Sequence, residues 1–441
     1  MDTSTSSTTN PTNTVETGTP GTKRGRIAVN FSWLMAGEVA AKGLAFVSTV
    51  YLARVLGKGN FGVFSFATAF LAYGMLLTDF GLSTYGTRAI ASSESKPEVC
   101  IQNVQSTRLV LAAFLFAVGS MLSFFIIHDH NTRLLFIFSF VGLIPYALGL
   151  DWAFRGMELM GFSALWNVLQ QAVFVVLVLA IVRGSGQLVA VPLCKAAGCL
   201  VASLYLIWIL RKRMADVDFS FSLRLPSRAT IARMLKLGIP LAASYLMVQV
   251  YWNIDTIILG VMDKPEAVGV YSAAYRVVMV ATGVCYTITN AFYPGLSYYY
   301  RHDVVAYRQK LIKMLTVVIT LGIGASVLIF ILRNMIISRI YGNGYEGSVI
   351  ALAILSVAVA GDYIVSAFGT AFISAGFEKV ALAAVVFGAV SNIGFNILLI
   401  PRYSYVGAGI ATVLSYVLMA VFYLANLRKI LSRRHNQVEQ E

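Results

Sequence analysis

Charged residues are scarce in this chain of 441 residues, since Asp, Glu, Lys and Arg together make up only 12%. Soluble globular proteins carry about a quarter of their residues as charged side chains. Hydrophobic residues reach 58%, and the mean hydropathy is +0.75. One water-soluble core cannot bury that much apolar surface, whereas a lipid bilayer requires it. The composition therefore excludes a soluble domain and predicts a polytopic membrane protein.

Cysteine is also rare, and several chemical motifs are missing. The four cysteines show no C-x-x-C spacing and no partnering histidine, which excludes a zinc site and a disulfide framework. We interpret them as small apolar residues inside helices. There is no G-x-x-x-x-G-K-[ST] motif, so the chain is not expected to hydrolyse ATP through a P-loop. No cofactor and no metal are predicted.

Apolar segments close to 20 residues long recur along the chain, and that length spans the hydrocarbon core as a helix. We expect an all-α protein with about twelve transmembrane helices. The expected spans are 29–52, 61–82, 108–127, 133–151, 159–182, 187–210, 238–262, 267–293, 313–333, 348–372, 379–400 and 405–427.

Lys and Arg gather on one side of these spans. With the N-terminus inside, the cytoplasmic stretches hold 23 of them and the outer loops hold 8, while Lys42, Lys195 and Arg276 lie within helices. The positive-inside rule then predicts a multi-pass protein of the cell (inner) membrane with both termini cytoplasmic. The same bias explains the net charge of +14 without nucleic acid. Contact with membrane lipid headgroups is the alternative use of the basic runs.

A polar stretch at 211–237 divides the helices six and six. We expect a disordered cytoplasmic tail at 1–26, an N-terminal lobe at 27–210, a cytoplasmic linker at 211–237, a C-terminal lobe at 238–427 and a cytoplasmic tail at 428–441.

A repeated pattern supports this division. In the first half, Leu-Gly at 56–57 is followed by Gly-Val-Phe-Ser at 62–65; in the second, Leu-Gly at 259–260 is followed by Gly-Val-Tyr-Ser at 269–272. The flanking helices run in the same direction in both copies. The two lobes are therefore expected to be related by a pseudo-two-fold axis along the membrane normal, as in some transporters.

Four stretches carry a resemblance to a known family. They are 30–91, which contains LARVLG, FGVFSFA and DFGLSTYGTR; 150–161, LDWAFRGMELMG; 252–276, which contains WNIDTIILG and VGVYSAAYR; and 392–416, NIGFNILLIPRYSYVGAGIATVLSY. In order and spacing they resemble the O-antigen type polysaccharide flippases of the multidrug/oligosaccharidyl-lipid/polysaccharide exporter superfamily. The resemblance covers nearly the whole chain after residue 22.

The resemblance implies two six-helix lobes around a cavity that opens alternately to each side. It implies transport rather than catalysis: an oligosaccharide linked to polyprenyl (pyro)phosphate would move from the cytoplasmic to the outer leaflet for polysaccharide export. A glycan polymerase and glycosyltransferases are then expected partners.

Ionisable side chains at membrane depth cost several kcal/mol, so they usually face a cavity or a partner. Glu38 and Lys42 stand at i and i+4, in the favourable order for an ion pair. Asp255 and Arg276 share a depth on neighbouring helices, so they either pair or face the cavity.

Lys195 and Asp362 lie on different lobes, where they either bridge to each other or act separately. Acting separately, Lys195 would meet a phosphate of the cargo and Asp362 would bind a coupling ion, H⁺ or Na⁺. Two rim arginines are added as headgroup contacts, with lipid snorkelling as the alternative. The candidate substrate-binding residues are Lys42, Arg54, Arg88, Lys195 and Arg276, and the candidate ion-coupling residues are Glu38, Asp255 and Asp362.

Three functions are alternatives to lipid-linked oligosaccharide flipping. A drug exporter of the same superfamily would be favoured by a net acidic cavity. A membrane glycan polymerase or ligase needs a large outer loop with catalytic groups, and no expected outer loop exceeds about 15 residues. An assembly partner of glycan-synthesis enzymes would tolerate loss of the buried charges.

Trp152, beside Asp151 at the end of a span, is interpreted as an interfacial anchor.

Overall fold

The computed structural model describes residues 20–94, 96–213 and 226–432, and this part of the chain is helical without strands. The expected tails at 1–26 and 428–441 lie largely outside these ranges, as does the part of the expected linker at 214–225. Helix begins at Pro20, and the linker range includes the end of one helix at Arg213 and the start of the next at Arg228.

Ten helices in the described chain are long and apolar enough to cross a membrane. Two of them bend sharply and cross twice: α1 (Pro20–Asp79) at Gly57 and α13 (Glu378–Ser432) at Ser404. Counting two legs for each confirms the expected twelve crossings. The other helices are α2 (Leu82–Ala91), α3 (Pro97–Ile126), α4 (His130–Val141), α5 (Leu143–Ala147), α6 (Asp151–Gly156), α7 (Met160–Ile181), α8 (Ala190–Arg213), α9 (Arg228–Met262), α10 (Pro265–His302), α11 (Val304–Ile340) and α12 (Glu346–Ser374).

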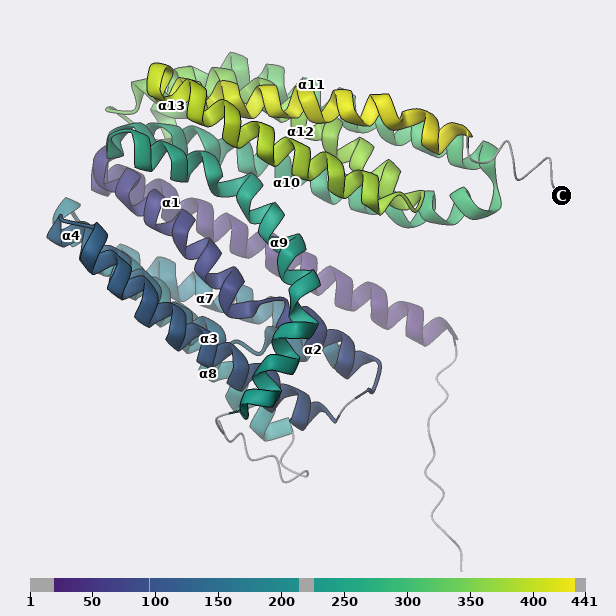
Figure 1. Ribbon diagram of the computed structural model, residues 1–441, viewed down its shortest axis with the longest axis horizontal. Helices are drawn as coiled ribbons and strands as arrows, with labels where there is room; N and C mark the ends of the chain where they lie inside the picture. Colours follow the sequence, from purple (N-terminus) through teal and green to yellow (C-terminus); the bar gives the residue numbers. More distant parts are fainter. Residues whose placement is uncertain (1–19, 95, 214–225, 433–441) are drawn as a thin grey trace, which may run out of the picture.

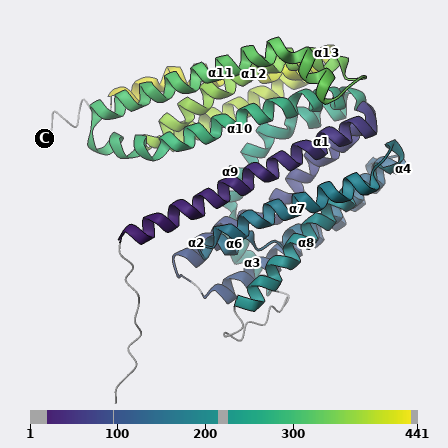
Figure 2. The same cartoon turned by 180° about the vertical axis from the view of Figure 1, so that it is seen from behind.

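Figure 1 shows two bundles, one built from α1 to α8 and one from α10 to α13, with α9 crossing from the first to the second. The two-lobe, all-α fold expected from the sequence is confirmed. We call the end with the turns at Gly57, Asp263 and Ser404 the outer end, and the opposite end the cytoplasmic end, following the expected orientation. The ribbons of the two lobes meet at the outer end and diverge toward the cytoplasmic end (Figures 1 and 2).

The connection between the two legs of α1 is shorter than expected. The sequence suggested a loop between 52 and 61, but only Gly57, with φ 72° and ψ 165°, leaves the helical conformation. A side chain at positive φ is strained, and glycine is not. The single glycine therefore lets the chain turn back at the outer surface with almost no loop.

The glycines of the repeat bring the two lobes into backbone contact. A Cβ atom on Gly62 would lie 1.8 Å from the carbonyl oxygen of Pro265, and one on Gly269 would lie 1.9 Å from that of Lys58. Each carbonyl comes from the residue four positions before the other glycine. Such reciprocal contact is what a two-fold axis produces, so the axis passes between α10 and the second leg of α1.

Helix α9 belongs to both lobes. Near its cytoplasmic end, Gly238 approaches the carbonyl of Phe80 and Leu241 packs on Gly81. Further along, Tyr245 shares a hydrogen bond of 3.1 Å with Thr84. The outer half instead packs against α13. This path puts the middle of α9 at the boundary between the lobes.

Candidate functional site

A polar cavity of about 230 Å³ lies where α9, α10 and the second leg of α1 converge. Each helix contributes four residues at i, i+3, i+4 and i+7, which is one helix face. The lining combines hydroxyls, two amides, two aromatic rings and one cation. Its residues are Ser65, Thr68, Ala69 and Ala72 from α1; Gln249, Trp252, Asn253 and Thr256 from α9; and Ser272, Tyr275, Arg276 and Met279 from α10.

The charge of this cavity is positive. Arg276 is the only charged residue among the described residues of its lining, and Lys195 of α8 is a second cation at membrane depth, in the opposite lobe. Neither residue takes part in an ion pair within the described chain. Two cations without an ion pair are unfavourable at membrane depth. A bound anion would compensate the charge of Arg276 in the cavity.

Asp255 is buried in the C-terminal lobe, with 6% of its surface exposed. Its carboxylate accepts hydrogen bonds from the Tyr271 hydroxyl at 2.8 Å, the Thr412 hydroxyl at 2.7 Å and the Asn396 amide at 2.5 Å. Asp255 forms no ion pair within the described residues. The suggested pairing of Asp255 with Arg276 is therefore wrong: equal depth left open which way each side chain faces, and Asp255 turns toward α13.

Asp362 of α12 accepts a hydrogen bond of 3.1 Å from the hydroxyl of Tyr416. The ring of Tyr416 meets Tyr251 edge-on, with centroids 5.6 Å apart. The suggested bridge between Lys195 and Asp362 is also absent from the ion pairs of the described chain. The C-terminal lobe thus holds two acidic side chains that are hydrogen-bonded only by neutral groups.

The remaining candidates lie apart from the cavity. Glu38 and Lys42 form the expected i, i+4 ion pair at 2.9 Å, well exposed on the first leg of α1. Arg54 donates to the carbonyls of Ile340, at 2.7 Å, and Arg339, so it caps the outer end of α11 in the other lobe. Arg88 is exposed on α2. Of the eight candidates, Arg276 alone lines the cavity.

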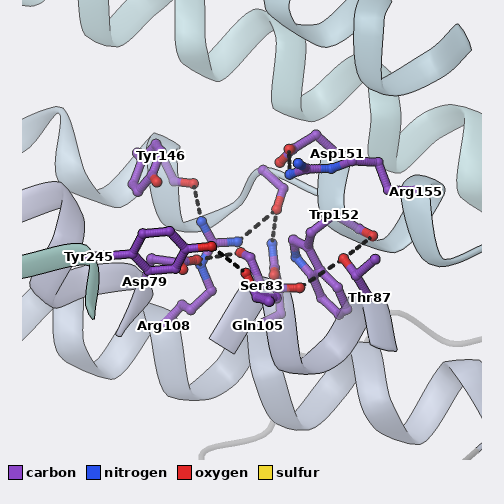
Figure 3. A network of polar contacts seen from close by, with 12 residues as sticks. Asp79, Ser83, Thr87, Gln105, Arg108, Tyr146, Asp151, Trp152, Arg155 and Tyr245 are labelled. Carbon is purple, nitrogen blue, oxygen red and sulfur yellow. Dashed lines mark hydrogen bonds and ion pairs between the residues drawn. The ribbon is translucent and has the colours of Figure 1, made fainter. Parts of the chain in front are cut away.

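A second polar cluster lies at the cytoplasmic end of the N-terminal lobe and was missed (Figure 3). Arg108 of α3 has only 2% of its surface exposed and pairs with Asp79 at 3.3 Å. Its guanidinium also donates to the carbonyls of Gly149, at 3.0 Å, and Tyr146, at 3.2 Å. The expected span 108–127 put Arg108 at the membrane surface, where it was counted among the 23 cytoplasmic basic residues; since it is buried within α3, that count falls to 22.

Trp152 is part of the same cluster, and its reading as an interfacial anchor is wrong. The side chain has 0% of its surface exposed and packs on Gly86, where a Cβ would lie 2.3 Å from the indole ring. Its carbonyl accepts a hydrogen bond of 2.9 Å from Thr87, and Asp151 pairs with Arg155 at 2.5 Å. The cluster joins α2 to α6 and fixes the cytoplasmic end of the lobe.

Comparison with known proteins identifies a sequence family for this chain. Residues 27–300 match the family model described as polysaccharide biosynthesis protein. A protein of Escherichia coli (strain K12) named "Putative O-antigen transporter" is 27% identical over 314 residues, which cover 69% of this chain and 73% of that protein.

Solved structures share the fold at low identity. An inward-facing multidrug resistance MATE family transporter of the MOP superfamily superposes with a TM-score of 0.71 at 16% identity, covering 89% of this chain and 95% of the other. The lipid II flippase MurJ, in an inward closed conformation, also gives 0.71, at 14% identity, covering 90% and 87%.

The fold is thus that of the two-lobed membrane transporters. The chain belongs to the polysaccharide biosynthesis protein family, and the resemblance to polysaccharide flippases drawn from its motifs is confirmed.

Proposed function

We propose that this protein flips an oligosaccharide linked to polyprenyl (pyro)phosphate from the cytoplasmic to the outer leaflet by alternating access. The observation that carries the proposal is a polar cavity between the lobes in which Arg276 is the only charged residue of the described lining. The family, the relative named as a putative O-antigen transporter and the fold shared with a lipid II flippase support transport rather than catalysis.

The chemistry of the cavity suits such a cargo. A phosphate that crosses low-dielectric surroundings needs positive charge on its path, because an unpaired buried charge is very costly. The Arg276 guanidinium can bind two phosphate oxygens at once, and the Lys195 ammonium acts as a point charge. The hydroxyls and amides of the lining match sugar hydroxyls. The positive cavity disfavours the alternative of exporting cationic drugs, since like charges repel.

The shape of the molecule fits one state of an alternating cycle. At the outer end the lobes are held by the contacts of Gly62 and Gly269, by Arg54 on α11, and by the Tyr345 hydroxyl on the carbonyl of Ala53 at 2.7 Å. These contacts would have to break for the cavity to open outward. Their hydrogen bonds are few, and each contributes a net of only about 1 kcal/mol, so reversal of the closure is energetically accessible.

Asp255 and Asp362 are the proposed coupling sites for H⁺ or Na⁺. Both are held at membrane depth by neutral donors, and a buried carboxylate gains most from a proton or a small cation. Glu38 already has Lys42 as its ion-pair partner, so it is the least favoured of the three candidate coupling residues. Flipping rates measured with a pH gradient at constant Na⁺, and with a Na⁺ gradient at constant pH, identify the ion.

The proposed function is tested in cells that depend on this protein for surface glycan. Lys195→Ala should block export while the protein still accumulates in the membrane, and Lys195→Arg should retain part of the activity. Lys212→Ala, which removes a lysine from the last turn of the same helix, is the matched control and should export normally. Full export by Lys195→Ala would remove this residue from the transport path.

We also propose the orientation: a multi-pass inner-membrane protein with both termini cytoplasmic, supported by the bias of basic residues. A reporter active only outside should work when fused after Lys264 and fail when fused after Asp218. Equal activity at both positions would contradict this topology. Association with a glycan polymerase and glycosyltransferases is proposed from the family alone.

A further inference from the structure

The face of α9 that lines the cavity carries four polar or aromatic side chains in an otherwise apolar helix. Gln249, Trp252, Asn253 and Thr256 follow the i, i+3, i+4, i+7 spacing, and we call this set the α9 stripe. None of them is a charge, so phosphate binding does not require them. Polar residues on a membrane helix are costly, which raises the question of what they bind.

The two amides of the stripe orient each other. The Asn253 Nδ2 atom donates to the Gln249 Oε1 atom at 2.8 Å and to the Gln249 carbonyl at 3.3 Å. That carbonyl also accepts from the Tyr73 hydroxyl of α1 at 3.2 Å. The Gln249 Nε2 and Asn253 Oδ1 atoms have no hydrogen-bond partner of their own among the described residues. One fixed donor therefore stands beside one fixed acceptor on the cavity wall.

This pair matches two neighbouring hydroxyls of a sugar ring. Each hydroxyl both donates and accepts, so one can accept from Gln249 Nε2 while its neighbour donates to Asn253 Oδ1. Trp252, with 41% of its surface exposed, stands between them in the stripe. An indole offers a large, rigid apolar face with little conformational entropy to lose, and the C–H face of a pyranose can pack on it.

The size of the cavity limits what it holds. Pockets for drug-sized ligands have volumes of roughly 300–1,000 Å³, and this cavity has about 230 Å³. It therefore takes one part of a lipid-linked oligosaccharide rather than the whole. Because Arg276 lines the same small cavity, the part beside the α9 stripe is a sugar ring close to the phosphate.

We propose that Gln249, Trp252 and Asn253 form a pyranose-binding subsite that recognises two adjacent ring hydroxyls while Arg276 holds the phosphate. This subsite rests on the proposed function, and it adds a specificity determinant on α9 that is separate from the charges. Trp252 contributes affinity for any pyranose, and the amide pair contributes the preference for adjacent hydroxyls.

The test measures binding to purified protein in nanodiscs. The probes are bare polyprenyl pyrophosphate, the same carrier bearing one glucose, galactose or N-acetylglucosamine, and deoxy analogues that lack one of two adjacent hydroxyls. Trp252→Ala should weaken binding of the sugar-bearing carriers about tenfold, which equals about 1.4 kcal/mol, and leave the bare carrier unchanged. Trp252→Phe should retain most of the affinity, and Trp208→Ala, exposed on α8, is the matched control.

A second variant separates the contribution of the amide pair to sugar binding from that of the Trp252 indole ring. Gln249→Leu should bind the intact sugar and its deoxy analogue equally, whereas the wild type should prefer the intact sugar. If wild-type protein binds bare and sugar-bearing carriers equally, or if Trp252→Ala weakens all of them alike, the subsite is contradicted while carrier binding and the proposed function stand. If no carrier binds at all, the proposed function fails with it.

Discussion

In the N-terminal lobe Arg108 is buried at the cytoplasmic end and paired with Asp79, while Lys195 lies at membrane depth without an ion pair in the described chain. In the C-terminal lobe Asp255, Asp362 and Arg276 lie along the membrane-spanning helices, without an ion pair in the described chain. The internal repeat allows the two lobes to be compared at equivalent positions.

Counting from Gly62 and Gly269, Ala69 is the counterpart of Arg276; counting from the two Leu-Gly pairs, Leu52 is the counterpart of Asp255. The two copies of the repeat have therefore diverged: at these two positions the N-terminal lobe has apolar residues where the C-terminal lobe has charges available for transport. Each of the following experiments alters one side of that contrast.

The largest expected effect on export comes from removing Arg276, the cation for which the N-terminal lobe has Ala69 at the equivalent position. Arg276→Ala should lower export about 100-fold, since truncating one charge of a desolvated site costs roughly 3 kcal/mol. Adding Ala69→Arg should restore part of the rate, because the cation returns to the same cavity from the opposite lobe. Initial rates of glycan appearance at the surface, normalised to protein in the membrane, measure both. Normal export by Arg276→Ala would show that the cavity charge is not used.

The second-largest loss of export is expected from alanine at either glycine of the repeat, and it should be equal for the two lobes. Gly62→Ala and Gly269→Ala each place a methyl group less than 2 Å from a carbonyl oxygen of the other lobe. Overpacking of this kind costs roughly 1–3 kcal/mol, so each should lower export about 30-fold by preventing closure at the outer end. Gly43→Ala and Gly283→Ala, where nothing lies within 4 Å of the added Cβ, are the controls. A large effect at one glycine and none at the other would contradict the symmetry.

Asp255→Asn should have a smaller effect, and it should change the coupling of flipping to an ion gradient rather than flipping itself. Its shape and most of its hydrogen bonds remain, but the charge that would bind a coupling ion is gone. We expect about tenfold less stimulation of flipping by an ion gradient, since coupling free energies are roughly 1–3 kcal/mol, with downhill flipping intact. Proteoliposomes with and without the gradient give this ratio. Unchanged stimulation would exclude Asp255 as the coupling site.

The smallest effect on export should come from the N-terminal cluster. Asp79→Asn leaves Arg108 buried without its ion-pair partner, although two carbonyls still accept from it. A loss of about 1–2 kcal/mol in stability changes abundance several-fold, so we expect about threefold less protein and a lower melting temperature. Export per molecule should be unchanged. Reduced export per molecule at normal abundance would mean that this cluster takes part in transport.

The sequence predicted the number of crossings and the two-lobe division correctly, because length and hydropathy decide which segments lipid accepts. The prediction from sequence failed for the direction in which a side chain points from its helix. Asp255 contacts Asn396 and Thr412, which lie 141 and 157 positions away, and no local pattern reveals them.

Arg108 was misplaced for a different reason. Helix α3 begins at Pro97, eleven positions before the expected start, so a residue expected at the membrane surface is buried. The cavity face was within reach of sequence reasoning, since Gln249, Trp252, Asn253 and Thr256 mark one face of an apolar helix.

The central claim is most directly tested with purified protein in liposomes that contain a fluorescent polyprenyl-pyrophosphate-linked oligosaccharide in both leaflets. A glycosidase added outside removes the label from the outer leaflet only. With wild-type protein the cleaved fraction should rise from about half toward completion, because the lipid of the inner leaflet reaches the enzyme, and with Arg276→Ala it should stay near half. A cleaved fraction that stays at half with wild-type protein, or that rises equally with Arg276→Ala, would contradict the account.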